Sequence, residues 1–394
     1  MPAPKIADQH NWNVLYVCST AEHGGANIQL MEMLKKINLS RYKPLIITPP
    51  PEKGTLLASF EALGVRLERL KMSIISAKLY NPVRLAKFCP GVIIDVVHII
   101  KLIQRKHIEL VHVNAANALA AGIASKLCGV PCVWQVHEIL TPKIVRFIVN
   151  SLIVLLANKI VVISKPVAKV FPHWAQRKIE IIHDGVDVEK FHPAISGLQI
   201  RKELGIPSES PVIGMVGRFV PRKGHRFFLK ACAKVAEQFP EAHFVMVGQT
   251  FPAYANYLEE IRQLVDDLDL SSKMHFAFWR TDMPEVTASL NIAVLASTLP
   301  EGFGLVMIEA MAMGKPVVAT KVGGVTDIVT EDVGCLVPPS DDQAMASAFI
   351  ELLSDKEMSK RRGEAGRKRI LNDFTSGRAA SQMEKVYHSL LKLN

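Results

Sequence analysis

The sequence predicts an α/β fold made of two Rossmann-like domains that face a cleft. The chain has 394 residues, which is more than one ordinary hydrophobic core organises. Short apolar runs alternate with segments of helical periodicity in both halves of the chain, as they do in doubly wound sheets. Hydrophobic residues make up 49% and charged residues 21% of the composition, which excludes an intrinsically disordered chain.

The first half contains apolar runs that predict strands, each short and nearly free of charged residues. They are residues 13–18, 44–48, 110–113, 132–136 and 160–163, and the segments 26–37 and 115–128 have helical periodicity. Continuous apolar strands that alternate with helices predict a parallel sheet covered on both faces. We therefore expect an N-terminal Rossmann-like domain over residues 1–195.

The second half repeats this plan after a polar stretch, residues 191–210, that predicts a linker. Its strand-like runs are residues 211–216, 243–247, 292–295 and 316–320, and its helix-like segments are 227–239 and 305–313. We expect a C-terminal Rossmann-like domain over residues 196–375 and a helix over 376–394 that packs back toward the first domain. Parallel sheets bind ligands at the carboxyl ends of their strands, so two facing sheets would form a cleft lined by both domains.

The positive charge of the chain is concentrated in its first half. Residues 1–195 hold 24 Lys and Arg against 13 Asp and Glu, whereas the remainder is nearly balanced. Such an excess attracts a membrane surface, a nucleic acid or a phosphorylated acceptor, unless it is only solubilising surface charge. The apolar stretches 92–103 and 144–163 contain too many polar residues for a spanning helix. They fit helices packed on a sheet or lying in a membrane interface.

The cysteines and the acidic residues do not predict a metal site. None of the six cysteines forms a CxxC pair, so we expect reduced thiols in the cytosol. The polar N-terminus predicts no secretory signal. Asp266, Asp267 and Asp269 form a dense acidic run in a charged helical stretch, which we interpret as a solvated face.

The run from Glu301 to Glu309 has the composition of an anion-binding loop. Gly302 and Gly304 allow a ligand to approach the backbone, and a helix beginning near Leu305 would direct N–H groups at a phosphate. The two glutamates flank this position, and carboxylates accept hydrogen bonds from the vicinal hydroxyls of a ribose or hexose. The alternative is structural, with Glu309 bonded to a loop and Glu301 solvated in a turn.

A basic loop, Gly217–Gly224, follows the first predicted strand of the second domain. Arg218 offers a planar fork of donors and Lys223 a compact charge, and both suit a diphosphate. The alternative is a basic surface loop.

Two weaker signals lie at strand ends of the first domain. Gly24 and Gly25 follow residues 13–18 but lack the GxGxxG spacing of an NAD site. His137 follows residues 132–136, where its ring can donate to a sugar hydroxyl or a phosphate oxygen and can shuttle protons. For each of these residues a structural role is the alternative.

In this order, the motifs resemble glycosyltransferase family 4, the retaining transferases of the GT-B fold. The likeness extends from about residue 13 to residue 374. It rests on the E-x7-E pair Glu301 and Glu309, the Phe303-Gly304-Leu305 core, Arg218, Lys223, the Gly-Gly loop, His137 and the segment Asp184-Gly185-Val186-Asp187.

The resemblance implies transfer of a sugar from a UDP-sugar or GDP-sugar, without a metal, to a glycan or lipid-linked acceptor. The C-terminal domain would bind the donor and the N-terminal domain the acceptor. Arg218 and Lys223 would neutralise the leaving diphosphate, Glu309 would hold the ribose, and Glu301 would bind a hydroxyl of the donor sugar. The protein would be cytoplasmic and associate peripherally with the inner face of a membrane.

The remaining site residues are also assigned by the resemblance. Backbone amides of Phe303, Gly304 and Leu305 would contact the sugar and the phosphate. Gly24 and Gly25 would approach the diphosphate, and His137 would bind the donor sugar or stabilise the reacting centre. The implied catalytic set is His137, Arg218, Lys223 and Glu301.

Some positions depart from the family pattern. Asp184 replaces the usual Asn, Asn27 lies where an acidic residue is frequent, and Val325-Thr326-Asp327 follows Gly323-Gly324 where Pro-Glu is common. A nucleotide-sugar epimerase shares the architecture and is one alternative, and a catalytically silent sugar-nucleotide binder is another. A nucleic-acid binder would explain the charge, but no recognised module appears.

Overall fold

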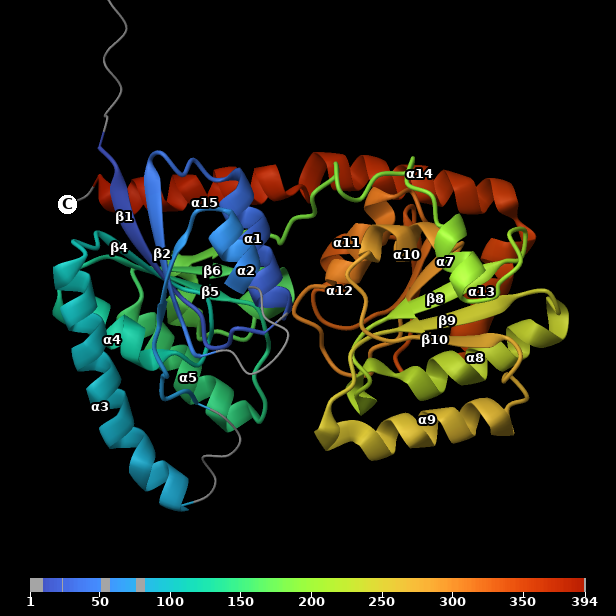
Figure 1. The fold of residues 1–394 in the computed structure, drawn as a ribbon, viewed down its shortest axis with the longest axis horizontal. Coiled ribbons are helices and arrows are strands. Elements are labelled where there is room, and N and C mark those ends of the chain that lie inside the picture. The colour runs from blue at the N-terminus through green and yellow to red at the C-terminus, as the bar shows by residue number, and fades with distance from the viewer. Residues whose placement is uncertain (1–9, 23, 51–56, 76–81, 393–394) are drawn as a thin grey trace, which may run out of the picture. The chain divides into compact units, whose positions relative to one another are not determined.

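The structure is a computed structural model that describes residues 10–22, 24–50, 57–75 and 82–392, the side chains of 82–87 excepted. These residues fall into two compact units (Figure 1). Unit 1 comprises Met1–Gly185 with Ser376–Asn394, and unit 2 comprises Val186–Thr375. The division falls before Val186, ahead of the boundary expected after residue 195.

Unit 1 is built on a seven-stranded parallel sheet with the order β3-β2-β1-β4-β5-β6-β7. The strands are β1 Trp12–Val17, β2 Tyr42–Thr48, β3 Arg66–Arg69, β4 Leu110–Val113, β5 Cys132–Val136, β6 Lys159–Val162 and β7 Ile179–Ile181. The central strands β4 and β5 are buried at every residue, which is why they read as continuous apolar runs.

Helices cover both faces of this sheet. They are α1 Gly25–Lys36, α2 Leu57–Ala62, α3 Pro82–Arg105, α4 Leu119–Leu127, α5 Lys143–Leu156, α6 Lys165–Ala168, the 3-10 helix η2 His173–Lys178 and α15 Ser376–Leu391. The chain changes direction across the sheet after β3, so right-handed crossovers place α1 and α2 on one face and α3, α4 and α5 on the other. In Figure 1, α4 lies between α3 and α5, while α15 runs along α1.

Unit 2 repeats the plan with a six-stranded parallel sheet in the order β10-β9-β8-β11-β12-β13. Its strands are β8 Val212–Val216, β9 His243–Val247, β10 Met274–Ala277, β11 Ile292–Leu295, β12 Val317–Thr320 and β13 Gly334–Val337. Its helices are α7 Leu198–Glu203, η3 Pro221–Lys223, α8 His225–Gln238, η4 Pro252–Tyr254, α9 Ala255–Asp267, α10 Met283–Ser289, α11 Leu305–Ala312, α12 Val325–Ile328, α13 Asp342–Ser354 and α14 Lys356–Asp373. The two predicted parallel sheets are thus confirmed.

The linker expected over residues 191–210 is wrong, because this segment packs into unit 2. It contains α7 and the buried side chain of Phe191. Arg201 of α7 is also buried, and its guanidinium donates to the backbone oxygen of Ser289 at 3.0 Å and to Asn291 Oδ1 at 2.7 Å. These hydrogen bonds fix α7 to the end of α10 and to the loop that leads into β11.

The two apolar stretches of unit 1 have different secondary structures. Residues 92–103 lie within α3, and residues 144–163 divide between α5 and β6. Within the part of the chain that the structure describes, no helix is both long and apolar enough to cross a membrane.

The helix α15 is fastened to unit 1 by Tyr387, which is fully buried. Its hydroxyl lies 2.6 Å from Nδ1 of His112 on β4 and donates to the hydroxyl of Tyr16 on β1 at 3.3 Å. Its ring packs edge-on against the ring of Tyr42, with centroids 5.5 Å apart. Burial lowers the pKa of His112 to about 3, so this cluster is uncharged at neutral pH.

We expect Tyr387→Ala to lower the free energy of unfolding by about 3–5 kcal/mol, because it empties a buried aromatic site. Tyr387→Phe keeps the ring but removes the polar partner of His112 and should cost about 1–3 kcal/mol. Urea titration followed by tryptophan fluorescence measures both values. An alanine variant as stable as the parent protein would contradict the role assigned to this ring.

Candidate functional site

Two loops of unit 2 meet at the carboxyl edge of its sheet. Residues 217–224 follow β8, and residues 296–304 follow β11. The first loop ends at Gly224, whose φ is +79°. A Cβ atom at this position would lie 1.9 Å from the carbonyl oxygen of Ala296, so only glycine allows the loops to pack this closely.

The contact that joins these loops is an ion pair between Lys223 and Glu301. Lys223 Nζ lies 2.6 Å from Glu301 Oε1, and Ser297 Oγ donates to the same oxygen at 2.5 Å. Arg222 Nη1 lies 3.7 Å from that oxygen. Burial by itself would raise the pKa of Glu301, but Lys223, Ser297 and Arg222 together hold this pKa below its ordinary value. Glu301 is therefore an ionised carboxylate although only 8% of its surface is exposed.

A third loop fixes the backbone of Glu301. The N–H of Gly324 donates to the carbonyl oxygen of Glu301 at 2.9 Å. Gly323 has a φ of +54°, and a Cβ atom there would lie 2.0 Å from the same oxygen. The sequence predicts no role for these glycines or for Ser297. A positive φ and a close backbone approach leave no signal in a single sequence beyond the glycine itself.

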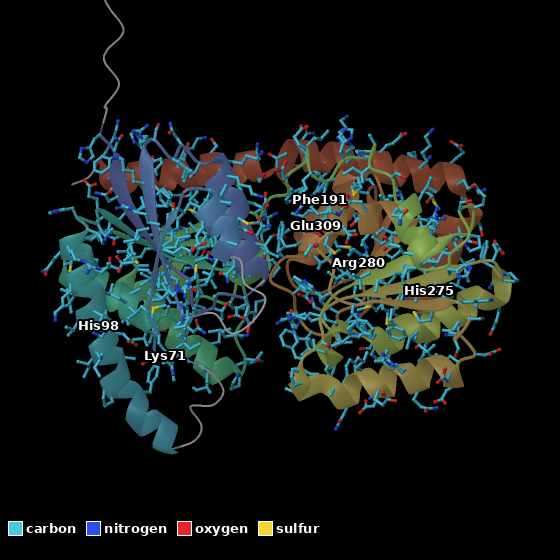
Figure 2. All side chains as sticks on the ribbon, viewed as in Figure 1. Lys71, His98, Phe191, His275, Arg280 and Glu309 are labelled. Carbon is cyan, nitrogen blue, oxygen red and sulfur yellow. The ribbon has the colours of Figure 1, made fainter. Side chains whose placement is uncertain are left out.

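The helix α11 begins beside Glu301 and carries Glu309 (Figure 2). Its first residue is Leu305, preceded by Gly304 with a φ of +122°. The N–H groups at such a helix start point away from the helix and favour an anion. Phe303 is buried with its ring centroid 5.9 Å from that of Phe374, which fixes the loop before the helix.

Arg218 lies on the same sheet edge but does not join the Glu301 cluster. Its side chain is exposed, and its guanidinium carbon lies 5.8 Å from the ring centroid of Phe251. Unit 2 thus presents a partly buried cation, Lys223, and an exposed one, Arg218, on one loop. A cation in each setting suits a ligand that carries two phosphates.

Unit 1 has its own polar cluster at the carboxyl edge of its sheet. The ring Nε2 of His137 lies 2.9 Å from Asn114 Oδ1. Asn114 follows β4, is buried, and donates its amide to the carbonyl oxygen of Ala26 at 3.2 Å. Because the amide nitrogen is used in this way, Asn114 Oδ1 is an acceptor and the proton lies on His137 Nε2. Asp184 Oδ1 lies 3.8 Å from the other ring nitrogen, Nδ1, which is buried without a hydrogen bond.

The Gly-Gly loop of unit 1 is held by Asn27. Its amide donates to the carbonyl oxygens of Thr20 at 3.0 Å and Glu22 at 2.9 Å. An acidic side chain could not donate these bonds, which explains the Asn at this position. Gly24 and Gly25 are exposed, and a Cβ atom on Gly24 would meet nothing within 4 Å. His23 of this motif lies outside the described residues.

The dense acidic run lies at the end of α9 and beyond it. Asp266, Asp267 and Asp269 are exposed, as expected of a solvated face. Among the residues that the structure describes, no group of three or more His, Cys, Asp or Glu side chains could hold a metal ion.

Two protein families match almost the whole chain between them. The family described as Glycosyltransferase Family 4 matches residues 23–190, and the family described as Glycosyl transferases group 1 matches residues 198–369. The chain is similar to N-acetyl-alpha-D-glucosaminyl L-malate synthase of Bacillus anthracis, with 26% identity over 73% of this chain and 77% of that protein. It is equally similar to UDP-Gal:alpha-D-GlcNAc-diphosphoundecaprenol alpha-1,3-galactosyltransferase of Escherichia coli, with 26% identity over 74% and 78%.

The fold is similar to that of Anabaena HepE, whose crystal structure contains UDP and glucose. The two structures superpose with a TM-score of 0.82 and 24% sequence identity, covering 95% of this chain and 99% of that one. This likeness shows the GT-B fold.

We expect Gly323→Ala to destabilise unit 2 more than a matched control, Gly205→Ala. Both residues have a positive φ, so each alanine costs about 1–2 kcal/mol for the left-handed conformation. At Gly205 a Cβ atom meets nothing within 4 Å, whereas at Gly323 it meets the backbone of Glu301. Urea titration of both variants gives the comparison, and equal losses would disprove the backbone clash.

We expect Asn114→Ala to disturb the ring of His137, because it removes the acceptor of the Nε2 proton. Asn114→Asp is the matched variant, since it retains an acceptor oxygen but cannot donate to Ala26. Ring ¹⁵N chemical shifts report which nitrogen of His137 carries the proton. An alanine variant with unchanged ¹⁵N shifts would show that Asn114 does not set the tautomer.

Proposed function

The chain belongs to glycosyltransferase family 4, and from this premise we propose the course of its reaction. Like its family, it transfers a sugar from a nucleotide-sugar donor. We propose that the donor is a UDP-sugar or GDP-sugar, that the acceptor is a glycan or a lipid-linked glycan, and that the anomeric configuration is retained. Unit 2 would bind the donor and unit 1 the acceptor.

The observation that carries this proposal is the ion pair of Lys223 with Glu301 at the carboxyl edge of the unit 2 sheet. When the bond between the anomeric carbon and the diphosphate breaks, negative charge builds on the diphosphate. Lys223 and Arg218 would stabilise that charge, because cations held in place before the reaction need no reorganisation. The start of α11 adds its dipole to the same effect.

The carboxylates take different parts in this proposal. Lys223, Ser297 and Arg222 all contact Oε1 of Glu301, so Oε2 would accept a hydrogen bond from a hydroxyl of the donor sugar. Glu309, one turn into α11, would hold the ribose hydroxyls. A protonated Glu301 would carry an O–H group that can donate a hydrogen bond. The ionised carboxylate only accepts hydrogen bonds, so it suits a sugar hydroxyl that donates.

The remaining proposed contacts with the substrates come from backbone groups and from His137. The amides of Phe303, Gly304 and Leu305 would contact the sugar and the phosphate at the start of α11. In unit 1, the exposed Gly24 and Gly25 would leave room for a diphosphate. His137 would contact the transferred sugar or the reacting centre.

The names of similar proteins support the donor and acceptor classes. HepE was crystallised with UDP and glucose, and the Escherichia coli relative is named for a UDP-sugar donor and a diphosphoundecaprenol acceptor. We propose by analogy that this chain acts in the cytoplasm, at the inner face of a membrane. The basic excess of residues 1–195 supports attraction to anionic lipids.

The donor is tested with the full chain in a thermal-shift screen against UDP, GDP, ADP and their sugars. We expect UDP or GDP to raise the melting temperature of the protein. We also expect the same nucleotide to be released from its sugar when acceptor is present. Incubation with the donor alone controls for epimerase activity. An isomerised donor sugar without any acceptor would overturn the transferase proposal.

We expect Arg218→Ala and Lys223→Ala each to lower kcat/KM by about 100- to 1,000-fold, as loss of a charge-stabilising donor does in other enzymes. Both variants should also bind the free nucleoside diphosphate more weakly. Isothermal titration and a coupled assay of released nucleotide measure these effects.

The control is Arg226→Ala, which removes a cation from the same unit. Arg226 is exposed on α8 and pairs with Glu260, so its loss should leave turnover unchanged. Normal turnover in the Arg218 and Lys223 variants would remove the diphosphate assignment.

A further inference from the structure

The outward faces of α3 and α5 expose large apolar side chains where a surface helix ordinarily carries polar ones. We call this set the α3–α5 apolar face. Its members are Ile93 (65% exposed), Ile94 (55%), Val97 (44%), Ile144 (67%), Phe147 (60%) and Ile148 (52%). On each helix the spacing of three and four residues places them in one stripe. Clusters of exposed apolar residues on a folded protein mark a binding surface.

Both stripes lie toward the carboxyl edge of the unit 1 sheet. Helix α5 begins at Lys143, soon after the carboxyl end of β5, so its exposed apolar residues are near that edge. On α3, Asp95 accepts a hydrogen bond at 2.6 Å from the N–H of Ser73, which lies just beyond β3. His137 and Asn114 follow β5 and β4 at the same edge. The apolar face therefore adjoins the edge that carries the proposed acceptor site.

The two helices face the same side of the sheet. Right-handed crossovers place α3, α4 and α5 together, and α4 packs against both neighbours. In Figure 1 all three lie on the side of unit 1 away from α15. His98, labelled in Figure 2, lies on the outward side of α3 one turn after Ile94 and is exposed. Both stripes therefore lie on the same side of unit 1.

The exposed charged side chains that the structure describes on α3 and α5 have one sign. The sequences of α3 and α5 contain a single acidic residue, Asp95, and it is buried. Lys101 on α3 and Lys143 on α5 are exposed, and Arg146 lies beside Phe147. Long basic side chains can lie along an apolar surface and reach anionic headgroups with their charged ends.

We propose that the α3–α5 apolar face of unit 1 binds an anionic phospholipid bilayer and so brings the acceptor edge of the sheet to the membrane surface. This inference rests on the proposed lipid-linked acceptor only for the role of membrane binding. The exposed residues of the surface do not depend on which reaction the protein catalyses. Apolar side chains enter the boundary between headgroups and acyl chains, while the lysines contact the headgroups. A second copy of the chain fits less well, because the like charges of the two faces would meet.

The test measures sedimentation of the full chain with vesicles. The vesicles contain phosphatidylcholine alone or a two-to-one mixture of phosphatidylcholine and phosphatidylglycerol. We expect binding to the mixed vesicles that weakens as salt is added. The double variant with Phe147→Ser and Ile148→Ser should weaken vesicle binding by about tenfold or more. The reason is that burial of each apolar side chain in the membrane raises the binding constant by about this factor. Lys101→Gln with Lys143→Gln should weaken binding about fivefold for each lysine, and only to the anionic vesicles.

The matched control is Leu198→Ser with Lys202→Gln on α7 of unit 2. Leu198 is 61% exposed and Lys202 is exposed, so this pair removes the same kinds of side chain from another surface. The control should bind vesicles as the parent does. Parent protein that does not sediment with mixed vesicles, or a Phe147 and Ile148 variant that binds unchanged, would overturn the proposal.

Two further measurements separate this proposal from the proposed function. Thermal shift with UDP or GDP tests the donor site of each variant without any lipid. A variant that loses vesicle binding but keeps its nucleotide shift supports the surface. Gel filtration without vesicles tests self-association, and a parent dimer that the Phe147 and Ile148 variant converts to a monomer would assign the face to a second copy instead.

Discussion

The ion pair between Lys223 and Glu301 sets the geometry of the unit 2 site. It joins the loop after β8 to the loop after β11, two strands that are neighbours in the sheet but distant in the sequence. Glycines make this contact possible, because Gly224 and Gly323 let backbones approach where any Cβ atom would collide. A largely buried pair of this kind gains little stability by itself, since the desolvation of both ions offsets their attraction. Its value lies in holding a carboxylate and a cation in fixed positions at the start of α11.

The sequence predicts most of the central architecture. Strands such as β5 and β9 are buried on both faces, and their continuous apolar runs leave little ambiguity. The edge strand β3, with the sequence Arg-Leu-Glu-Arg, has no such run, and it is recognised only through its pairing with β2. The segment around α7 reads as a linker because it is polar and contains several Pro and Gly residues. It nevertheless packs into unit 2, where the guanidinium of Arg201 bonds to Ser289 and Asn291, which are distant in the sequence. Composition cannot report where such partners lie.

In the candidate site too, some residues could be predicted from the sequence and others could not. Lys223, Glu301 and the loop before α11 could be selected from residue type and position after predicted strands. Ser297, Asn114 and Asn27 could not, because each acts through a hydrogen bond to another polar group and not through a motif. Asn27 is instructive, since it departs from the family pattern and its amide donates to the very loop it follows. In this chain the departure has a structural role, because an amide can donate both bonds and an ionised carboxylate cannot.

Unit 1 is discontinuous in the sequence, because α15 completes it after the whole of unit 2 has intervened. During synthesis, unit 2 has all of its residues available before unit 1 does. The side chains of Tyr16 and Tyr42 in the unit 1 sheet therefore stay uncovered until Tyr387 has been synthesised. Translation that stops before α15 would release chains with a complete unit 2 and an incomplete unit 1. Such chains would expose apolar surface of unit 1 to chaperones and proteases.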